Sequence, residues 1–445
     1  DVSMLRNFQF TEDRGPTSHA VKPKEYVSID NFYTTTIYEK GAELIRMLEL
    51  LLGKERFIEG VKLYIETFDG CAATTEDFID SVIKGACSDG SNPAFDVDQF
   101  QNWYYKSGTP KVLVEQRWDK KNSTLIVSFE QQLNDDITNS NVDMIIPILF
   151  SCYHKEKKIE PIVAESLFIL DKSKKELKIK GLKGNENQPV LSLLRGFSAP
   201  IEYKSDLTTD DYLFLFLNDN DYFSRWDSGQ ILMRQIIRYR INNNPDIYLE
   251  NCFLDSLEQL IVNLGIKESS FVSSVLTIPG LSELERSQTE VNPSAIHRAR
   301  LSFQCSIGLR LFEDLKTLLQ AVRTQIDQIW PDGQGERKLT EIIWSLFILS
   351  GDNETKRDCV KAVDKSSMTM ARAALNALKL IDCLEAKEAS NLFFEKWKDN
   401  PVVLDAWFFY EASRSNVNAI EVVQRLFCHN KFDWMAPNAI RAVLG

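Results

Sequence analysis

The first residues to consider are those that could hold a catalytic metal ion. A zinc site in a hydrolase uses about three protein ligands, and two of them are commonly histidines one helical turn apart. The chain has only four histidines, none in an H-E-x-x-H pattern: His19, His154, His297 and His429. We therefore expect no zinc site from these residues. We interpret His19, which lies in a proline-flanked loop, as a surface or loop-packing residue.

Motifs for other chemistries are missing from the sequence as well. There is no G-x-S-x-G elbow, no G-x-x-x-x-G-K-[ST] loop and no G-x-G-x-x-G fingerprint. The eight cysteines are scattered without a C-x-x-C pair. This spacing argues against a disulfide framework and a structural zinc knuckle, and it is typical of a reducing compartment.

One tyrosine-bearing segment could take part in acyl chemistry. Residues 31–43 read NFYTTTIYEKGAE and place Tyr33 and Tyr38 ahead of an apolar helical pattern. A tyrosine hydroxyl is protonated at neutral pH and can donate a hydrogen bond to a developing oxyanion. From these residues alone, simple packing of Tyr38 at a helix start is the commoner use of such a side chain.

Four further segments accompany residues 31–43 in a recognisable order: LRNFQFTED at 5–13, WYYKSGTP at 103–110, GFSAP at 196–200 and NDYFSRWD at 220–227. With these five segments the chain resembles the aminopeptidase N family of zinc metallopeptidases, the thermolysin-like gluzincins, and in particular the bacterial type. The resemblance covers essentially all of the chain in colinear order. Chance agreement of five separate segments is very unlikely.

The resemblance implies roles for several residues. In that family a zinc-bound water attacks the peptide carbonyl after the N-terminal residue, and a tyrosine hydroxyl stabilises the oxyanion. Tyr38 corresponds to that tyrosine, and Tyr33 to a residue near the pocket for the N-terminal side chain. Arg441 falls near a cavity-lining position of the helical domain, although a solvated helix face explains it equally well. Glu39 and Lys40 belong to the motif, but charge preferences at a helix start suffice to explain them.

The departures from the family pattern are equally informative. The amine-recognition motif Gly-x-Met-Glu-Asn, both histidine ligands, the glutamate ligand and the glutamate base have no counterpart, and the last helices of the helical domain are also missing. We therefore expect the chain to be a fragment of an aminopeptidase of peptide catabolism. Its partners would be peptide substrates and the missing N-terminal half. The full-length protein would bind zinc, whereas this chain alone would bind none and be inactive.

Two other interpretations remain open. One is a non-catalytic helical scaffold, or a degenerate homologue, that binds peptides on a concave face. The other is a naturally processed chain that reassociates with its N-terminal half. A coding sequence upstream that contains H-E-x-x-H would favour the enzyme.

The spacing of apolar residues predicts the elements that position Tyr38. In residues 1–108 it is helical: one helix ends at Gly53, another has its N-cap at Thr75, and a fourth runs through Phe100 to Tyr104. We expect this zone to be the helical half of a thermolysin-like catalytic domain.

The period then changes twice along the chain. In residues 109–204 apolar and polar side chains alternate with a period of two, which predicts a small β-sandwich. Pro147 in this zone predicts an edge strand or a bulge. Residues 205–445 are helical again without a strand signal, which predicts an all-α superhelical domain. The fold class is therefore multidomain α+β.

Charge and hydropathy exclude several classes of partner. The net charge is −12 and the isoelectric point is about 5.1. The sequence has no Lys/Arg block that could follow a phosphate backbone, and no apolar run long enough to span a bilayer. We therefore expect no nucleic acid and no membrane as partners, and a cytoplasmic location.

Overall fold

The computed structural model describes the chain except residues 1, 133–142, 157–159, 183–186, 287 and 416–417. The described residues form two compact units. The first unit contains residues 1–232 and 280–291, and the second contains residues 233–279 and 292–445. The division falls inside helix α9 (Tyr222–Ile241).

The first unit begins with short turns and then a compact group of helices. These elements are α1 (Val2–Met4), η1 (Leu5–Gln9), α2 (Phe10–Glu12), η2 (Ile29–Phe32), η3 (Thr36–Lys40), α3 (Gly41–Leu52), α4 (Lys54–Phe68), α5 (Thr75–Ala86), α6 (Val97–Phe100) and α7 (Asn102–Tyr105). The predicted helix before Gly53 is confirmed as α3, which buries its apolar stripe of Leu44, Met47, Leu48, Leu51 and Leu52. Gly53 ends it with a positive φ of 84°, a conformation that suits glycine.

Two local predictions in this group are wrong. Helix α5 is capped by Thr74, not Thr75, because the Thr74 hydroxyl accepts the Asp77 N–H while the Asp77 carboxylate accepts the Thr74 N–H. The single helix expected through Phe100 is two helices, α6 and α7, separated at Gln101.

The β-sandwich of the first unit has two sheets. One has the order β5-β2-β1-β7 and the other β4-β3-β6. The strands are β1 (Lys111–Asp119), β2 (Thr124–Gln132), β3 (Ile146–Tyr153), β4 (Val163–Leu170), β5 (Lys174–Ile179), β6 (Val190–Leu193) and β7 (Glu202–Ser205). All neighbouring strands are antiparallel except β1 and β7, which are parallel. Alternation predicted β1 and β2, and short apolar runs predicted β3 to β5. Strands β6 and β7 are too short to show either pattern.

The prediction that Pro147 itself marks an edge strand or a bulge is wrong. Pro147 lies in β3, the middle strand of its sheet, and pairs with Ile169 of β4. It is tolerated because β6 pairs with Phe150–Tyr153 and no strand of the described residues pairs with Pro147 on that side, so no N–H is needed there. The irregularity in the β3–β4 pairing falls at Phe150/Cys152 instead.

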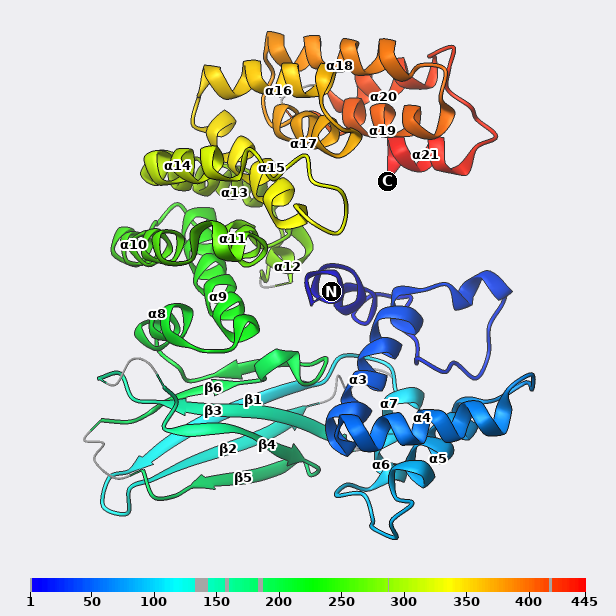
Figure 1. Cartoon of the computed structure of the whole chain (residues 1–445), viewed down its shortest axis with the longest axis vertical. Helices are drawn as coiled ribbons and strands as arrows, with labels where there is room; N and C mark the ends of the chain where they lie inside the picture. The colour runs from blue at the N-terminus through cyan, green and yellow to red at the C-terminus, as the bar shows by residue number, and fades with distance from the viewer. Residues whose placement is uncertain (1, 133–142, 157–159, 183–186, 287, 416–417) are drawn as a thin grey trace. The chain divides into compact units, whose positions relative to one another are not determined.

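Helices and sandwich share one hydrophobic core. Figure 1 shows α3 to α7 gathered at one end of the two sheets. Leu48 of α3, Trp103 of α7 and Phe129 of β2 belong to the same buried cluster. The indole N–H of Trp103 also donates to the backbone carbonyl of Ile145, with 2.8 Å between the atoms. The turn that carries Tyr38 is thus connected, through α3, to a large rigid core.

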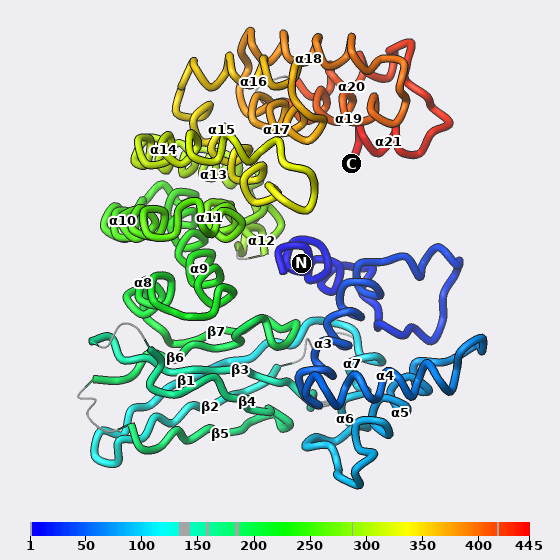
Figure 2. The backbone as a smooth tube through the Cα atoms, in the orientation of Figure 1, coloured from blue at the N-terminus to red at the C-terminus, as the bar shows by residue number. Residues whose placement is uncertain are grey.

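The second unit is entirely helical in its described part. Figure 2 shows its helices stacked in successive layers. Besides the second half of α9, it contains α10 (Ile247–Leu264), η5 (Gly265–Glu268), α11 (Ser269–Leu276), α13 (Pro293–Arg310), α14 (Phe312–Val322), α15 (Gln334–Leu349), α16 (Asn353–Lys365), α17 (Met368–Leu378), α18 (Leu384–Trp397), α19 (Pro401–Ala412), α20 (Ala419–Phe427) and α21 (Pro437–Leu444). Helices α8 (Thr209–Asn218) and α12 (Leu281–Glu285) belong to the first unit. The predicted order of helices, sandwich and helical array is therefore confirmed. None of the described helices combines the length and apolar character needed to cross a membrane.

Candidate active site

The two tyrosines selected from the sequence lie next to each other. Tyr38 is in the π-helical turn η3, and Tyr33 ends the preceding turn η2. Their rings stack with centroids 6.3 Å apart and an angle of 22° between the planes. Tyr38 is 58% exposed and Tyr33 is 70% exposed, so neither ring is buried within this chain. π-helical turns are rare and often occur at functional sites.

A carboxylate fixes the backbone just before Tyr38. One oxygen of Glu12 accepts the Thr36 N–H at 2.8 Å, the Thr36 hydroxyl at 2.8 Å and the Thr35 hydroxyl at 2.5 Å. The carboxylate thereby satisfies donors at the start of η3, where backbone N–H groups have no partner within the turn. Three hydrogen bonds to one oxygen leave little freedom for the turn.

A buried ion pair fixes the backbone just after Tyr38. The Lys40 ammonium lies 3.1 Å from an Asp13 carboxylate oxygen and 2.9 Å from the Gly108 carbonyl oxygen. The Thr109 hydroxyl donates to the same Asp13 oxygen at 2.9 Å. The Lys40 side chain is only 1% exposed and that of Asp13 is fully buried. A buried charge of this kind is tolerated because it is paired and hydrogen-bonded.

Two arginines connect the remaining segments of the first unit. Arg6 forms an ion pair with Asp227 at 2.5 Å. Burial opposes the charge of Arg6, but the Asp227 carboxylate outweighs it and raises the pKa of the guanidinium. Arg46 of α3 donates to the backbone carbonyl oxygens of Gly196 and Phe197. All five segments that carry the family resemblance are therefore joined by polar contacts around η3 and α3.

The explanation of Lys40 by a helix-start charge preference is wrong. A residue chosen for that reason would be solvated, whereas Lys40 is buried and holds three chain segments together. Glu12 and Asp13 hold the turn that carries Tyr38, and sequence reasoning missed both of them. Their spacing to Thr36 and Lys40 has no short-range pattern, so the only signal was their place inside the matched segment at 5–13.

The other predicted site residue, Arg441, lies on α21 of the second unit. It is exposed, and its guanidinium donates to the Asn438 side chain one turn earlier, at 3.2 Å. Its proposed role in substrate binding stays a prediction. His19 behaves as expected for a loop residue, since its Nδ1 lies 2.8 Å from the Ala20 carbonyl oxygen.

The resemblance implies a zinc ion, which needs about three protein ligands. Among the residues that the structure describes, no group of three or more His, Cys, Asp or Glu side chains could hold a metal ion. The described residues therefore do not fit zinc. What this chain can supply is a pair of exposed phenols on a backbone turn that is held at both ends.

Comparison with known families decides what kind of protein this is. Residues 3–104 match the peptidase family M1 domain, residues 108–206 match a domain of unknown function with an Ig-like fold, and residues 209–445 match a domain of unknown function made of ARM repeats. The last match alone takes in more than half of the chain, and relatives named aminopeptidase N match the chain over its full length. The chain belongs to the aminopeptidase N family. The domain limits 108 and 204 predicted from the sequence stay predictions.

Individual relatives agree with this family. Aminopeptidase N of Haemophilus influenzae is 30% identical over 459 residues, and that of Caulobacter vibrioides is 31% identical over 465 residues. A crystal structure of Legionella pneumophila aminopeptidase A in complex with aspartic acid superposes with a TM-score of 0.84 at 26% identity. Each match covers 100% of this chain but only 51%, 50% and 52% of the respective relative. The chain thus spans about half the length of the family members it matches.

Proposed function

We propose that this chain is the C-terminal half of a cytoplasmic, zinc-dependent aminopeptidase that hydrolyses N-terminal residues from peptides. In this proposal the Tyr38 hydroxyl donates a hydrogen bond to the oxyanion of the tetrahedral intermediate. Tyr33, stacked beside it, contacts the N-terminal side chain of the substrate. The observation that carries the proposal is the exposed phenol of Tyr38 on a turn locked at both ends, in a member of a peptidase family.

The rigidity of the turn is what makes the phenol useful. A donor stabilises a developing charge most when it is already in place and no energy is spent in moving it during the reaction. Glu12 holds the backbone two residues before Tyr38, and Lys40 holds it two residues after. Without such supports an exposed side chain would lose conformational entropy with each reaction.

The rest of the active site comes, in this proposal, from the other half of the protein. That half provides the zinc ligands and the general base, so this chain alone is inactive. Two observations support the proposal: the relatives are about twice as long, and many large apolar side chains near the start of the chain are exposed. Exposed apolar surface of this extent commonly marks an interface. Besides Tyr33 and Tyr38 of the proposed active site, these residues are Met4, Phe8, Tyr26, Val27 and Ile29.

The cytoplasmic location rests on the cysteines. Cys71 and Cys428 are exposed, and all eight cysteines are free thiols. Free exposed thiols suit a reducing compartment.

The decisive experiment substitutes Tyr38 in the protein that contains both halves. Tyr38→Phe should lower kcat for an alanyl or leucyl amide by about 100- to 1000-fold, because one oxyanion donor is lost. Bound zinc and KM should change little. Tyr64→Phe is the control, since Tyr64 also packs on aromatic rings, those of Phe68 and Phe78, and lies outside the exposed apolar group proposed as the interface. A fall in kcat of less than tenfold for Tyr38→Phe, or an equal fall for both variants, would contradict the assigned role.

A second measurement tests the division of labour between the halves. The purified chain should contain no stoichiometric zinc by elemental analysis and should not hydrolyse a leucyl amide, with or without added zinc. Zinc-dependent turnover by the chain alone would overturn the proposal that the other half provides the metal ligands.

A further inference from the structure

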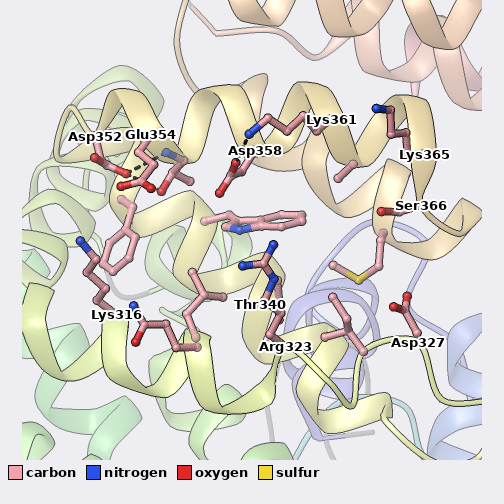
Figure 3. Close-up of a pocket in the computed structure, with 18 of the residues that line it drawn as sticks. Lys316, Arg323, Asp327, Thr340, Asp352, Glu354, Asp358, Lys361, Lys365 and Ser366 are labelled. Atoms are coloured by element: carbon pink, nitrogen blue, oxygen red, sulfur yellow. Dashed lines mark hydrogen bonds and ion pairs between the residues drawn. The ribbon is translucent and has the colours of Figure 1, made fainter.

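The second unit contains a pocket of about 410 Å³ between α14, α15 and α16, remote in sequence from the tyrosine motif. Figure 3 shows the charged side chains around it. Its apolar part is formed by buried and half-buried residues: Phe312, Leu319, Ile326, Trp344, Phe347 and Met370. An apolar floor with a few charged groups is the usual composition of a ligand site.

The charges along α16 follow an order. Glu354, Asp358, Lys361 and Lys365 occupy positions i, i+4, i+7 and i+11, so they share one face of the helix, and all four line the pocket. Figure 3 shows them succeeding one another along α16, acidic at the beginning and basic at the end. At 1.5 Å per residue, Glu354 and Lys365 are separated by about 16 Å along the helix axis.

Some of these charges already have partners. Asp358 and Lys361 form an ion pair at 2.9 Å, and the Asp352 carboxylate accepts the Thr355 N–H at 2.8 Å. In the described part of the chain, by contrast, Glu354, Lys365 and Arg323 have no ion-pair partner. Arg323 stands on the opposite wall, across the pocket from α16. Two more charged side chains line the pocket: Lys316 lies near Asp352 and Glu354, and Asp327 lies toward the Lys365 end. The end at the start of α16 therefore carries two carboxylates and one ammonium group, whereas the middle and the other end carry the two cations Arg323 and Lys365 and one carboxylate.

We propose that this pocket binds a short peptide with free termini, separately from the tyrosine motif. The peptide's ammonium group lies at Glu354, its carboxylate at Lys365 or Arg323, and an apolar side chain packs on the floor around Trp344. At about 3.3 Å per extended residue, a peptide of up to about five residues spans the distance. The inference rests on the proposed function, because short peptides are the substrates and products of an aminopeptidase.

Calorimetric titration of this chain with the pentapeptide Ala-Ala-Leu-Ala-Ala tests the proposal, since binding requires no catalysis. The free peptide should bind one site, and acetylation of its N-terminus or amidation of its C-terminus should each weaken binding by about three- to tenfold, as expected for partly exposed charge pairs. Added salt should weaken binding of the free peptide more than that of the doubly blocked peptide.

Variants locate the site. Glu354→Gln should abolish the effect of N-acetylation, and Lys365→Gln with Arg323→Gln should abolish the effect of C-amidation. Lys356→Gln is the control, because Lys356 lies on α16 outside the pocket and donates to Asn353. Tyr38→Phe should bind the peptide unchanged, which distinguishes this site from the proposed active site. No binding, equal binding of free and blocked peptides, or unchanged binding by the pocket variants would refute the proposal.

Discussion

The buried ion pair behind the tyrosine motif allows the sharpest test of the structure. Lys40→Met removes the ammonium but keeps an unbranched side chain of similar volume, so packing changes little. It leaves the fully buried Asp13 carboxylate with the Thr109 hydroxyl as its remaining donor from this cluster. Breaking a buried pair by removing one partner costs about 3–5 kcal/mol. Solvent does not screen this ion pair and so does not reduce the cost, because both side chains are at most 1% exposed.

Substitution of Asp13 and substitution of Lys40 should reduce stability by different amounts. In Asp13→Asn the amide oxygen can still accept from Lys40, and the Gly108 carbonyl remains in place. This variant should therefore lose less stability than Lys40→Met. The double variant should be more stable than the sum of the two single losses predicts, since it leaves no unpaired charge.

Hydrogen exchange is the suitable assay, since a chain of two units need not unfold in one step. Amides of η3 and α3 report the free energy of opening near Tyr38. Lys62→Met is the control, because its ion pair with Glu59 is exposed and should contribute about 0–1 kcal/mol. If Lys40→Met changed the opening free energy as little as Lys62→Met, the buried pair would not hold the turn and this reasoning would be refuted.

Two further outcomes follow from contacts in the same unit. The Lys22 ammonium lowers the pKa of Glu76 to about 2, so the pair should stabilise the fold fully above pH 4.5 and lose its effect as pH falls through 2. Lys22→Met should remove this contribution to the pH dependence of the unfolding free energy. The contribution is less than about 1 kcal/mol, because both side chains are partly exposed. Urea unfolding at pH 3 and pH 6 measures it. Gly60→Ala should destabilise the α4–α5 contact by about 1–3 kcal/mol, since a Cβ would lie 2.3 Å from the Val82 carbonyl oxygen. Gly41→Ala, whose Cβ has ordinary contact distances, should leave the melting temperature unchanged or raise it; equal melting temperatures for both alanine variants would contradict the packing argument.

Local sequence patterns predicted the fold well where an element is long and has one buried face. The helical pattern that ends at Gly53 became α3, and the period of two that begins after residue 109 became β1 and β2. The spacing of apolar residues does not predict short elements such as β7, whose pairing with β1 comes from tertiary contacts. It also fails at Pro147, where tolerance depends on which part of β3 the neighbouring strand covers.

The candidate site was predictable only in part for a related reason. Tyr33 and Tyr38 could be selected because they lie together in a matched segment. Their supports could not, because Asp13 and Lys40 are far apart in sequence and a lysine in an acidic, polar stretch is usually solvated. No single-sequence pattern distinguishes a buried paired lysine from an exposed one.

Within the tyrosine motif, residues 31–43, the buried side chains differ from the exposed ones in what they contact. Thr36, Lys40 and Glu43 are buried, and each contacts another chain segment or secures an arginine that does. Only Tyr33 and Tyr38 present large exposed rings there. The buried residues could be replaced without touching a substrate, yet their loss would free the turn and cost the phenol its fixed position. If Tyr38 has the proposed role, variants of these three buried residues should impair stability and turnover together, whereas Tyr38→Phe should impair turnover alone.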